Sequence, residues 1–152
     1  MNSFTLIFGA RPARGILVIG AVPKNVRWRH VHARGPQPAV RAWRVEADHQ
    51  IQTPRGSLRA RGGEDFIIET ADGDHRVVRS DIFERTYEAL GGGLYRKRDD
   101  VDLRYFTLDR PALVKTLEGE QEAQPGDWIM QGVAGELWPV PRAEAERKYE
   151  HA

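Results

Sequence analysis

The sequence predicts an α+β protein built mainly from strands, and three observations support this class. Short apolar runs of strand length, such as Phe4–Phe8 and Ile16–Val22, are separated by glycine-containing turns. Good helix formers gather near the C-terminus, over Ala143–Lys148. A pattern of residues also recurs at a spacing near 62. Because strands precede a helix in each copy, strands and helices are segregated along the chain, as in α+β proteins.

Residues 1–40 predict a basic, β-rich N-terminal extension. The two apolar runs are joined by seven residues that contain Gly9 and Gly15, which favours a β-hairpin. The joining segment lacks the Gly-Lys-Ser/Thr ending of a Walker loop, so we predict a turn rather than a phosphate site. Arg11, Pro12 and Arg14 interrupt the apolar stretch that a secretory signal would need, and we therefore expect a cytoplasmic protein.

The remainder of the chain contains an internal duplication, in which residues 104–150 repeat the pattern of residues 41–88. Chance does not readily place glycines, aspartates, aromatic residues and a Tyr-Glu ending in one register. We predict two repeat units, over residues 41–90 and 94–152, that could pack as one globule. The matched pairs include Thr53 with Thr116, Gly56 with Gly119, Gly63 with Gly126, Asp65 with Asp127, Phe66 with Trp128, and Tyr87-Glu88 with Tyr149-Glu150.

Each copy predicts the same order of elements. In the second copy an extended run over Leu113–Glu118 meets a turn at Gly119, and a polar strand and a hairpin around residues 132–135 follow. A short helix closes each copy. In the first copy, Asp81 and Glu84 have the spacing of a capping box at the start of that helix. The glycines at positions 91–93 then predict a linker between the copies.

Composition excludes several classes of site. The chain has 152 residues and no cysteine, so disulfides, thiolate metal sites and a cysteine nucleophile are excluded. No run approaches the length of about 18 apolar residues that a membrane helix needs. We predict no cofactor and no resident metal.

The formal net charge of +1 conceals a separation of charge along the sequence. Up to Val45 the chain has eight basic residues and no acidic one, whereas from Glu64 onward it has 12 Lys+Arg and 20 Asp+Glu. Two interpretations follow: the two regions carry complementary charge within one fold, or the basic part binds a polyanion.

The basic part contains a strip with the chemistry of a nucleic-acid surface, in which arginines could bind phosphates and a Trp could stack on a base. On a strand, Trp28, His30 and His32 would share one face. His30 and His32 could alternatively offer two imidazoles to a metal, with His49 as a remote third. A half-exposed strand with an aromatic anchor is the simpler interpretation. The candidate ligand-binding or nucleic-acid-binding residues are Arg27, Trp28, Arg29, His30, His32 and Arg34.

The second copy resembles the PGDYG-motif family, small proteins of bacteria and their phages that largely lack an assigned function. The resemblance rests on Pro125-Gly126-Asp127-Trp128-Ile129, with Gly135-Glu136 and the Tyr149-Glu150 ending around it. It covers about two-thirds of the chain, more weakly in the first copy, and leaves residues 1–40 outside. Trp128 replaces the motif Tyr, and Ile129 replaces its last Gly. The resemblance implies a bacterial or phage-related protein but no reaction.

The repeated motif residues could form a site or could serve the fold. A carboxylate beside a Tyr can support acid–base chemistry, but an enzyme rarely needs the same pair in both copies, whereas a fold does. We therefore predict structural roles, with the aspartates in turns and the aromatic rings in the core. His75 beside Asp74 is likewise interpreted as a turn pair. The residues concerned are Asp65, Phe66, Tyr87, Glu88, Asp127, Trp128, Tyr149 and Glu150.

Three functions remain open from the sequence. The first, which we favour, is a non-enzymatic binding or interaction protein, whose partner is a protein or an anionic ligand. The second is a nucleic-acid-binding protein that uses the N-terminal strip. The third is a small enzyme or nucleotide-ligand binder with a cleft between the two copies. We expect no membrane partner, and a homodimer is compatible with the apolar N-terminal runs.

Overall fold

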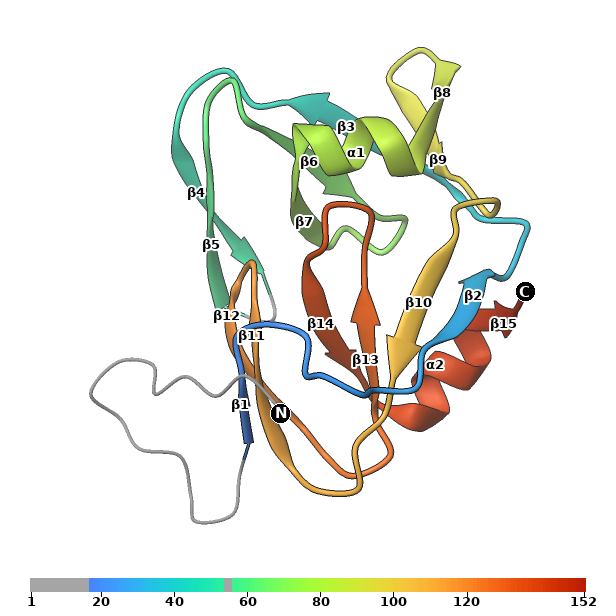
Figure 1. Ribbon diagram of the computed structural model, residues 1–152. Coiled ribbons are helices and arrows are strands. Elements are labelled where there is room, and N and C mark those ends of the chain that lie inside the picture. Colours follow the sequence, from blue (N-terminus) through green and yellow to red (C-terminus); the bar gives the residue numbers. More distant parts are fainter. Residues whose placement is uncertain (1–16, 54–55) are drawn as a thin grey trace. The chain divides into compact units, whose positions relative to one another are not determined.

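The computed structural model describes residues 17–53 and 56–152, and this part of the chain is mostly β (Figure 1). Strands account for 51% of the structure. Two helices of seven residues are present, one after β7 (His75–Arg79) and one after β14 (Leu137–Val140). The described residues form two compact units: unit 1 comprises residues 17–34 with 102–152, and unit 2 comprises residues 35–101. The predicted strand Phe4–Phe8, and with it the predicted N-terminal hairpin, lies outside the described residues.

Unit 1 contains a five-stranded and a three-stranded sheet. The five-stranded sheet has the order β14-β13-β10-β2-β15, and the smaller sheet has the order β1-β11-β12. β1 runs parallel to β11, and the pairs within the larger sheet are antiparallel. The elements are β1 (Leu17–Ile19), β2 (Arg29–Ala33), β10 (Leu103–Phe106), β11 (Ala112–Thr116), β12 (Gly119–Ala123), β13 (Trp128–Gln131), β14 (Leu137–Val140), α2 (Arg142–Lys148) and β15 (Tyr149–His151).

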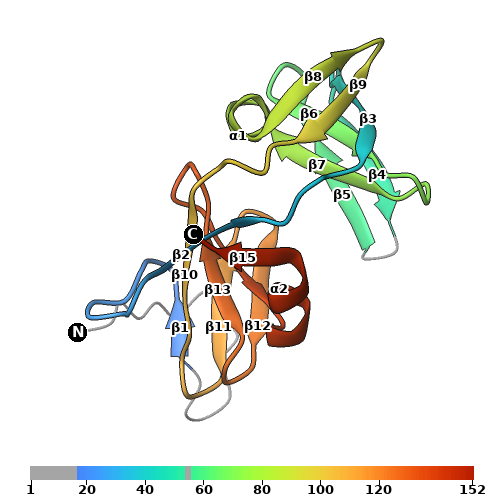
Figure 2. The ribbon, with the colours of Figure 1, turned by 90° about the vertical axis from the view of Figure 1, so that its right-hand side faces the viewer.

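Unit 2 contains a five-stranded sheet of order β7-β6-β3-β9-β8 and a separate hairpin, β4-β5. Figure 2 shows this unit with α1 beside the sheet and the β8–β9 hairpin extending from it. The elements are β3 (Ala39–Arg44), β4 (His49–Thr53), β5 (Gly56–Ala60), β6 (Asp65–Glu69), β7 (His75–Arg79), α1 (Ser80–Thr86), β8 (Tyr87–Gly91) and β9 (Leu94–Lys97).

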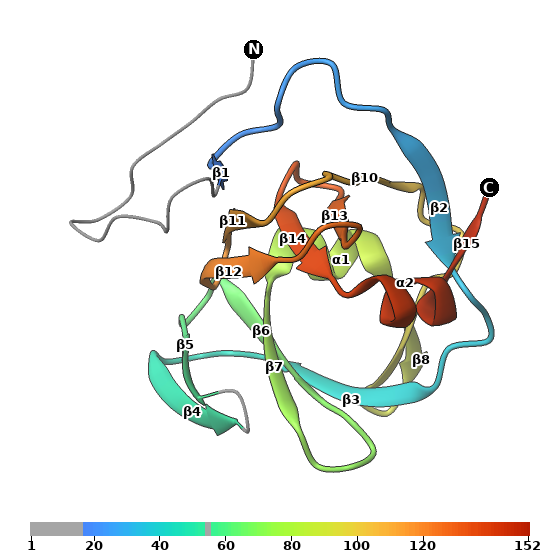
Figure 3. The same cartoon turned by 90° about the horizontal axis from the view of Figure 1, so that it is seen from below.

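The two five-stranded sheets have the same order when β3–β8 are matched with β10–β15, and β2 then occupies the place of β9. The register agrees, because Ala33 lies opposite Tyr149 in unit 1 and Lys97 lies opposite Tyr87 in unit 2. Figure 3 shows β2 beside β15. The sheet of unit 1, which holds the second copy, is therefore completed by β2, which precedes the first copy in the sequence. The sheet of unit 2, which holds the first copy, is completed by β9, which precedes the second copy.

A pair of backbone hydrogen bonds supports the match of β2 with β9. The Arg34 N–H donates to the carbonyl oxygen of Lys148 over 2.9 Å, and the Arg98 N–H donates to that of Thr86 over 2.8 Å. Lys148 and Thr86 end the two helices at matching positions. Arg34 and Arg98, each just after its strand, are thus counterparts.

The cores form on the faces that the alternating strand pattern predicts. In unit 1 one cluster brings β1, β10, β11, β13 and β14 together around Phe106 and Ile129. In unit 2 each face of the sheet carries part of a core, because Phe66 and Phe83 pack on the helix side while Val45 and Ile67 pack on the side of β4-β5.

Both predicted helices are present, but neither ends its unit. Tyr87 and Tyr149 leave the helices in extended conformation, with φ of −124° and −125°, and begin β8 and β15. The predicted capping box is wrong: α1 begins after Arg79 without a side-chain cap. The Asp81 carboxylate instead accepts hydrogen bonds from the guanidinium of Arg79, the shorter over 2.7 Å.

The predicted glycine linker is also wrong. Gly91, Gly92 and Gly93 all have positive φ, between 65° and 95°, and form the turn between the paired strands β8 and β9. Three successive residues in this region of conformational space favour glycine strongly. The triplet therefore serves a tight hairpin rather than a flexible connection.

Within the described residues, no helix has the length and apolar character needed to cross a membrane.

Candidate binding surface

The predicted N-terminal strip lies partly in β2. Within β2, His30 is exposed and Val31 is buried, whereas Arg29, which the alternation places on the face of Val31, is exposed as well. Trp28 precedes the strand and is only half-buried. Its ring meets the ring of Phe106 edge-on, with centroids 5.3 Å apart, and the guanidinium carbon of Arg104 lies 3.9 Å above it. Trp28 is thus engaged within unit 1, as the aromatic-anchor interpretation predicts.

Three members of the strip, His30, His32 and Arg34, have acidic partners in the same unit, and Nδ1 of His32 lies 3.7 Å from the carboxylate of Glu150. The Nδ1 atom of His30 lies 3.1 Å from the carboxylate of Asp102. The Arg34 guanidinium donates to the carboxylate of Glu150 over 3.2 Å. These pairs join the basic N-terminal part of the sequence to its acidic C-terminal part, so complementary charge within one fold explains part of the separation.

Arg27 and Arg29 differ from the other charged residues of the strip. Both are exposed, and in the described part of the chain neither forms a hydrogen bond or an ion pair. They are the two strip residues whose charge is available to an external anion.

The alternative use of the histidines as metal ligands finds no support within either unit. The Nδ1 atom of His32 lies 3.2 Å from the carbonyl oxygen of Ala33, whereas His49 belongs to unit 2, with Nδ1 2.9 Å from the carbonyl oxygen of Ala47. A search of the described residues found no group of three or more His, Asp or Glu side chains arranged to hold a metal ion.

The motif aspartates hold equivalent turns in the two units. The carboxylate of Asp65 accepts the N–H of Arg61 over 2.8 Å, and that of Asp127 accepts the N–H of Gln124 over the same distance. Just before them, Gly63 and Gly126 have φ of 75° and 86°. A carboxylate used by backbone donors in both units has the structural role predicted for it.

The motif aromatics lie in the cores. In unit 1 the ring of Trp128 stacks on Tyr105 at 3.7 Å, and the Tyr105 hydroxyl lies 3.0 Å from Nε2 of His151. In unit 2 the ring of Phe66, the counterpart of Trp128, stacks on Phe83 at 4.1 Å. Burial raises the pKa of Tyr105.

The residues of the two Tyr-Glu endings pack or pair within their own units. Tyr149 is buried in unit 1, and Glu150 pairs with Arg34. Tyr87 packs against the helix-side core of unit 2, where burial raises its pKa. Glu88 is exposed and lies opposite Arg96 in the β8–β9 pairing. Neither unit arranges its Tyr-Glu pair as an acid–base couple.

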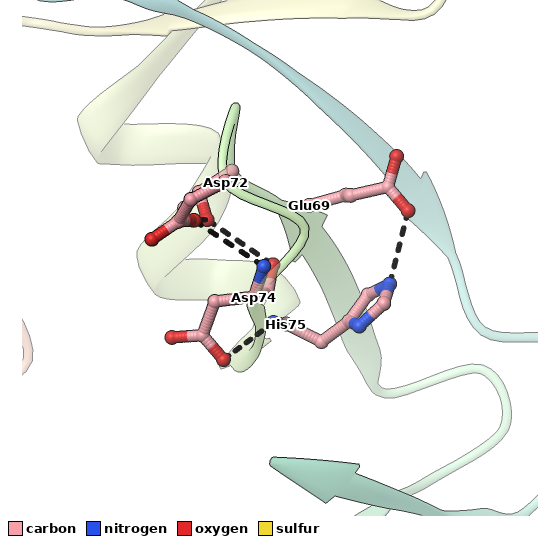
Figure 4. A network of polar contacts seen from close by, with 5 residues as sticks. Glu69, Asp72, Asp74 and His75 are labelled. Atoms are coloured by element: carbon pink, nitrogen blue, oxygen red, sulfur yellow. Dashed lines mark hydrogen bonds and ion pairs between the residues drawn. The ribbon is translucent and has the colours of Figure 1, made fainter. Parts of the chain in front are cut away.

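His75 lies in the turn network between β6 and β7 (Figure 4). The carboxylate of Asp74 accepts the backbone N–H of His75 over 2.8 Å, which confirms the predicted turn pair. The imidazole points elsewhere, with Nε2 3.0 Å from the carboxylate of Glu69. On its other side the ring meets Trp43, with centroids 6.3 Å apart.

The outer face of the sheet in unit 2 is the feature that the sequence analysis missed. Trp43 is 42% exposed and Leu94 is 38% exposed. Arg41 lies opposite Leu94 and two residues before Trp43, so all three side chains share one face. Among the described residues the side chain of Arg41 forms no hydrogen bond or ion pair. We call Arg41, Trp43 and Leu94 the open face.

The counterpart of the open face in unit 1 is covered. Phe106, which matches Trp43, is 1% exposed because Trp28 and the segment that begins with β1 pack over it. The position that matches Trp28 in unit 2 is Gly92, which has no side chain. Positions 28 and 92 both lie outside the aligned copies, so the repeat carries no signal for this difference, which depends on the pairings of β2 with β10 and of β9 with β3.

A small polar cavity of about 210 Å³ also lies in unit 2, between the chain around Gln37 and the residues that follow β9. It is lined by both charge signs, and Arg98 and Asp100 on its wall pair with each other over 3.1 Å. This volume is below the range typical of small-molecule sites. The cavity does not concentrate catalytic groups.

The units together define a class of protein, a two-unit β-rich chain whose repeated polar residues serve its turns. No protein-family model, curated protein or solved structure matches the chain.

Proposed function

We propose that the protein is a non-enzymatic binding protein that presents the open face of unit 2 to a partner. It is a cytoplasmic protein of bacterial or phage origin, built from a duplicated unit that resembles the PGDYG motif. The observation that carries the proposal is the exposure of Trp43 beside Arg41, at a position where unit 1 covers its own aromatic residue. Exposed aromatic and arginine side chains dominate binding energy at protein interfaces.

The use of the repeated residues supports binding over catalysis. Asp65 and Asp127 are committed to backbone donors, and Trp128 and Tyr149 are buried in the core of unit 1. The repeated side chains that an active site would use thus stabilise turns and cores instead.

Nucleic-acid binding through the N-terminal strip is the second candidate, because Arg27 and Arg29 are exposed and free of acidic partners among the described residues. Trp28 argues against it, since its ring is packed against Phe106 and Arg104. This candidate requires binding that weakens steeply with salt and that is lost when Arg27 and Arg29 are replaced by Glu.

A peptide array probed with the purified full chain tests the proposed function. We expect a set of bound peptides that is lost with Trp43→Ser and retained with Leu117→Ser. Leu117 is a matched control, because it is an apolar side chain that is 56% exposed but lies in unit 1. The Trp43 variant should keep the thermal unfolding midpoint of the wild type, since its side chain is largely at the surface.

Catalysis is the alternative that the same preparation can reveal. Turnover of nucleotides or esters that Asp127→Ala abolishes in a folded protein would contradict the proposal. So would an array on which both surface variants behave as the wild type does.

A further inference from the structure

Unit 1 shows how an open face of this kind is filled. β1 lies parallel to β11, with Leu17 opposite Ala112 and Ile19 opposite Val114. The chain then continues to Trp28, which packs against Phe106 and beneath Arg104. One segment, residues 17–28, thus adds a strand of three residues and, beyond a turn at Lys24 and Asn25, supplies an aromatic side chain.

Unit 2 has the same acceptor without the segment. β4 matches β11, because His49 pairs with Ala60 as Ala112 pairs with Ala123. Within the described residues β4 is paired on one edge only, with β5. Ile51 on β4 is half-buried, whereas its counterpart Val114 is 0% exposed beneath the added strand.

The aromatic slot of unit 1, in which Arg104 and Phe106 hold Trp28, has counterpart residues in unit 2. Arg41 matches Arg104 and Trp43 matches Phe106, and these are the two side chains that hold Trp28 in unit 1. In unit 2 the residue at the position of Trp28 is Gly92, in the turn of the β8–β9 hairpin. Unit 2 therefore has counterparts of both residues of the slot and no aromatic side chain at the position of Trp28.

We propose that unit 2 binds an extended peptide strand of a partner protein, parallel to β4 along His49–Ile51, with an aromatic side chain between Arg41 and Trp43. The proposal rests on the proposed function and names the partner. Strand addition to a free sheet edge supplies backbone hydrogen bonds, and a side-chain slot supplies specificity. The partner has the chemistry of residues 17–28, an aliphatic run followed by basic residues and an aromatic one.

Charge favours a peptide over a nucleic acid as the occupant. Unit 2 has 11 Lys+Arg and 12 Asp+Glu, a formal net charge of −1. Glu69 is bound to His75, which contacts Trp43, and Asp72 lies in the adjacent turn. The carboxylates of Glu69 and Asp72 repel the phosphates of a nucleic acid. They attract a peptide that carries Lys or Arg.

The test is a titration of the ¹⁵N-labelled full chain with a synthetic peptide of residues 17–30, followed by NMR. We expect shifts of the His49–Ile51 amides and of the Trp43 indole N–H. A peptide in which the residue matching Trp28 is Gly should bind at least about tenfold more weakly, because the aromatic and cation–π contacts are lost. A scrambled peptide of the same composition is the control for charge alone.

Protein variants locate the site. Trp43→Ser should weaken the wild-type peptide at least about tenfold, Trp43→Phe should restore most of the affinity, and Leu117→Ser should leave it unchanged. Loss of binding in the Ser variant with rescue by Phe shows that the slot, and not the fold, is responsible.

Four results would overturn the inference. Shifts confined to β11 would mean exchange with the chain's own segment in unit 1. Shifts of β4 that grow with protein concentration, without peptide, would identify a second copy as the occupant. A salt-sensitive shift of Trp43 with oligo-dT would identify nucleic acid. No response to millimolar peptide, with array hits that still depend on Trp43, would leave the proposed function standing and remove strand addition.

Discussion

Asp65 is a carboxylate buried in unit 2, and its role shows what the motif contributes at the scale of one residue. It is 6% exposed, and its partner is the backbone N–H of Arg61. Its own backbone N–H donates to the carbonyl oxygen of Arg61 over 3.1 Å, so one residue closes the turn from both sides. Asp127 repeats the arrangement with Gln124.

We expect Asp65→Ala to destabilise the protein by about 2 kcal/mol, because a buried backbone donor loses a charged acceptor. Urea unfolding at neutral pH measures the change. Asp109→Ala is the control, since that carboxylate is exposed and lies 3.9 Å from Arg110, and its removal should cost less than about 0.5 kcal/mol. Equal stability of the two variants would show that Asp65 is retained for another reason.

The residue scale is also where prediction from the sequence succeeded and failed most clearly. The role of Asp65 follows from its repetition, because a residue type that recurs after the same turn is required by the turn. The exposure of Trp43 does not follow, because an aromatic residue on a strand predicts burial by default. Exposure depends on Gly92, which becomes a neighbour of Trp43 only through the β3–β9 pairing.

At the scale of elements, the aromatic ring that stacks on the motif aromatic residue comes from a strand in unit 1 and from the helix in unit 2. In unit 1 the ring stacked on Trp128 belongs to Tyr105 on β10, and the helix carries Ala145. In unit 2 the ring stacked on Phe66 belongs to Phe83 on the helix, and the strand position that matches Tyr105 is Ala42. The small and large residues are thus exchanged between strand and helix, which preserves the volume of the core.

The exchange predicts energetic coupling between positions 42 and 83. Phe83→Ala should cost about 3–5 kcal/mol through the cavity it leaves. Ala42→Tyr should cost about 1–3 kcal/mol through overpacking in the wild-type core. The double variant should be more stable than the sum of the two costs predicts by at least about 1 kcal/mol.

A double-mutant cycle measured by urea unfolding checks this. Additive costs would mean that the two rings occupy different spaces in the two units. Ala89→Ser, at an exposed position of β8, serves as the control because it should be neutral within about 0.5 kcal/mol.

The elements themselves were largely predictable, since the hairpins and helices follow from glycine turns and from helix-forming residues. β13 and β14 pair as the hairpin around residues 132–135 predicts. The strands β8 and β15 were missed because they are short and follow a helix without a turn signal. Tyr87 and Tyr149 leave the helix directly into extended backbone, with ψ of 149° and 154°.

At the scale of the whole molecule, the decisive feature is that β2 completes unit 1 and β9 completes unit 2. A sequence repeat cannot show which copy of a strand enters which sheet, because both assignments satisfy the same pattern of side chains. The consequence is an asymmetry: unit 2 is continuous over residues 35–101, whereas unit 1 is assembled from residues on both sides of it.

Unit 2 should therefore fold as an isolated fragment of residues 35–101, because all the strands of its sheet lie within that range. We expect a cooperative thermal transition by circular dichroism and dispersed amide signals by NMR. A fragment of residues 102–152 lacks β2, the strand between β10 and β15, and should not fold. Folding of the second fragment, or disorder of the first, would contradict the assignment of strands.

The pairing of β2 with β15 has a mechanical consequence. The two strands are antiparallel, and the N–H of Ala152 donates to the carbonyl oxygen of His30 beside the His151–Val31 pair. A force pulling Arg29 away from Ala152 acts at one end of this ladder, so its hydrogen bonds are loaded one after another, as in a zipper. Unit 2, inserted between β2 and β10, bears no tension until the β2–β10 pairing has opened as well.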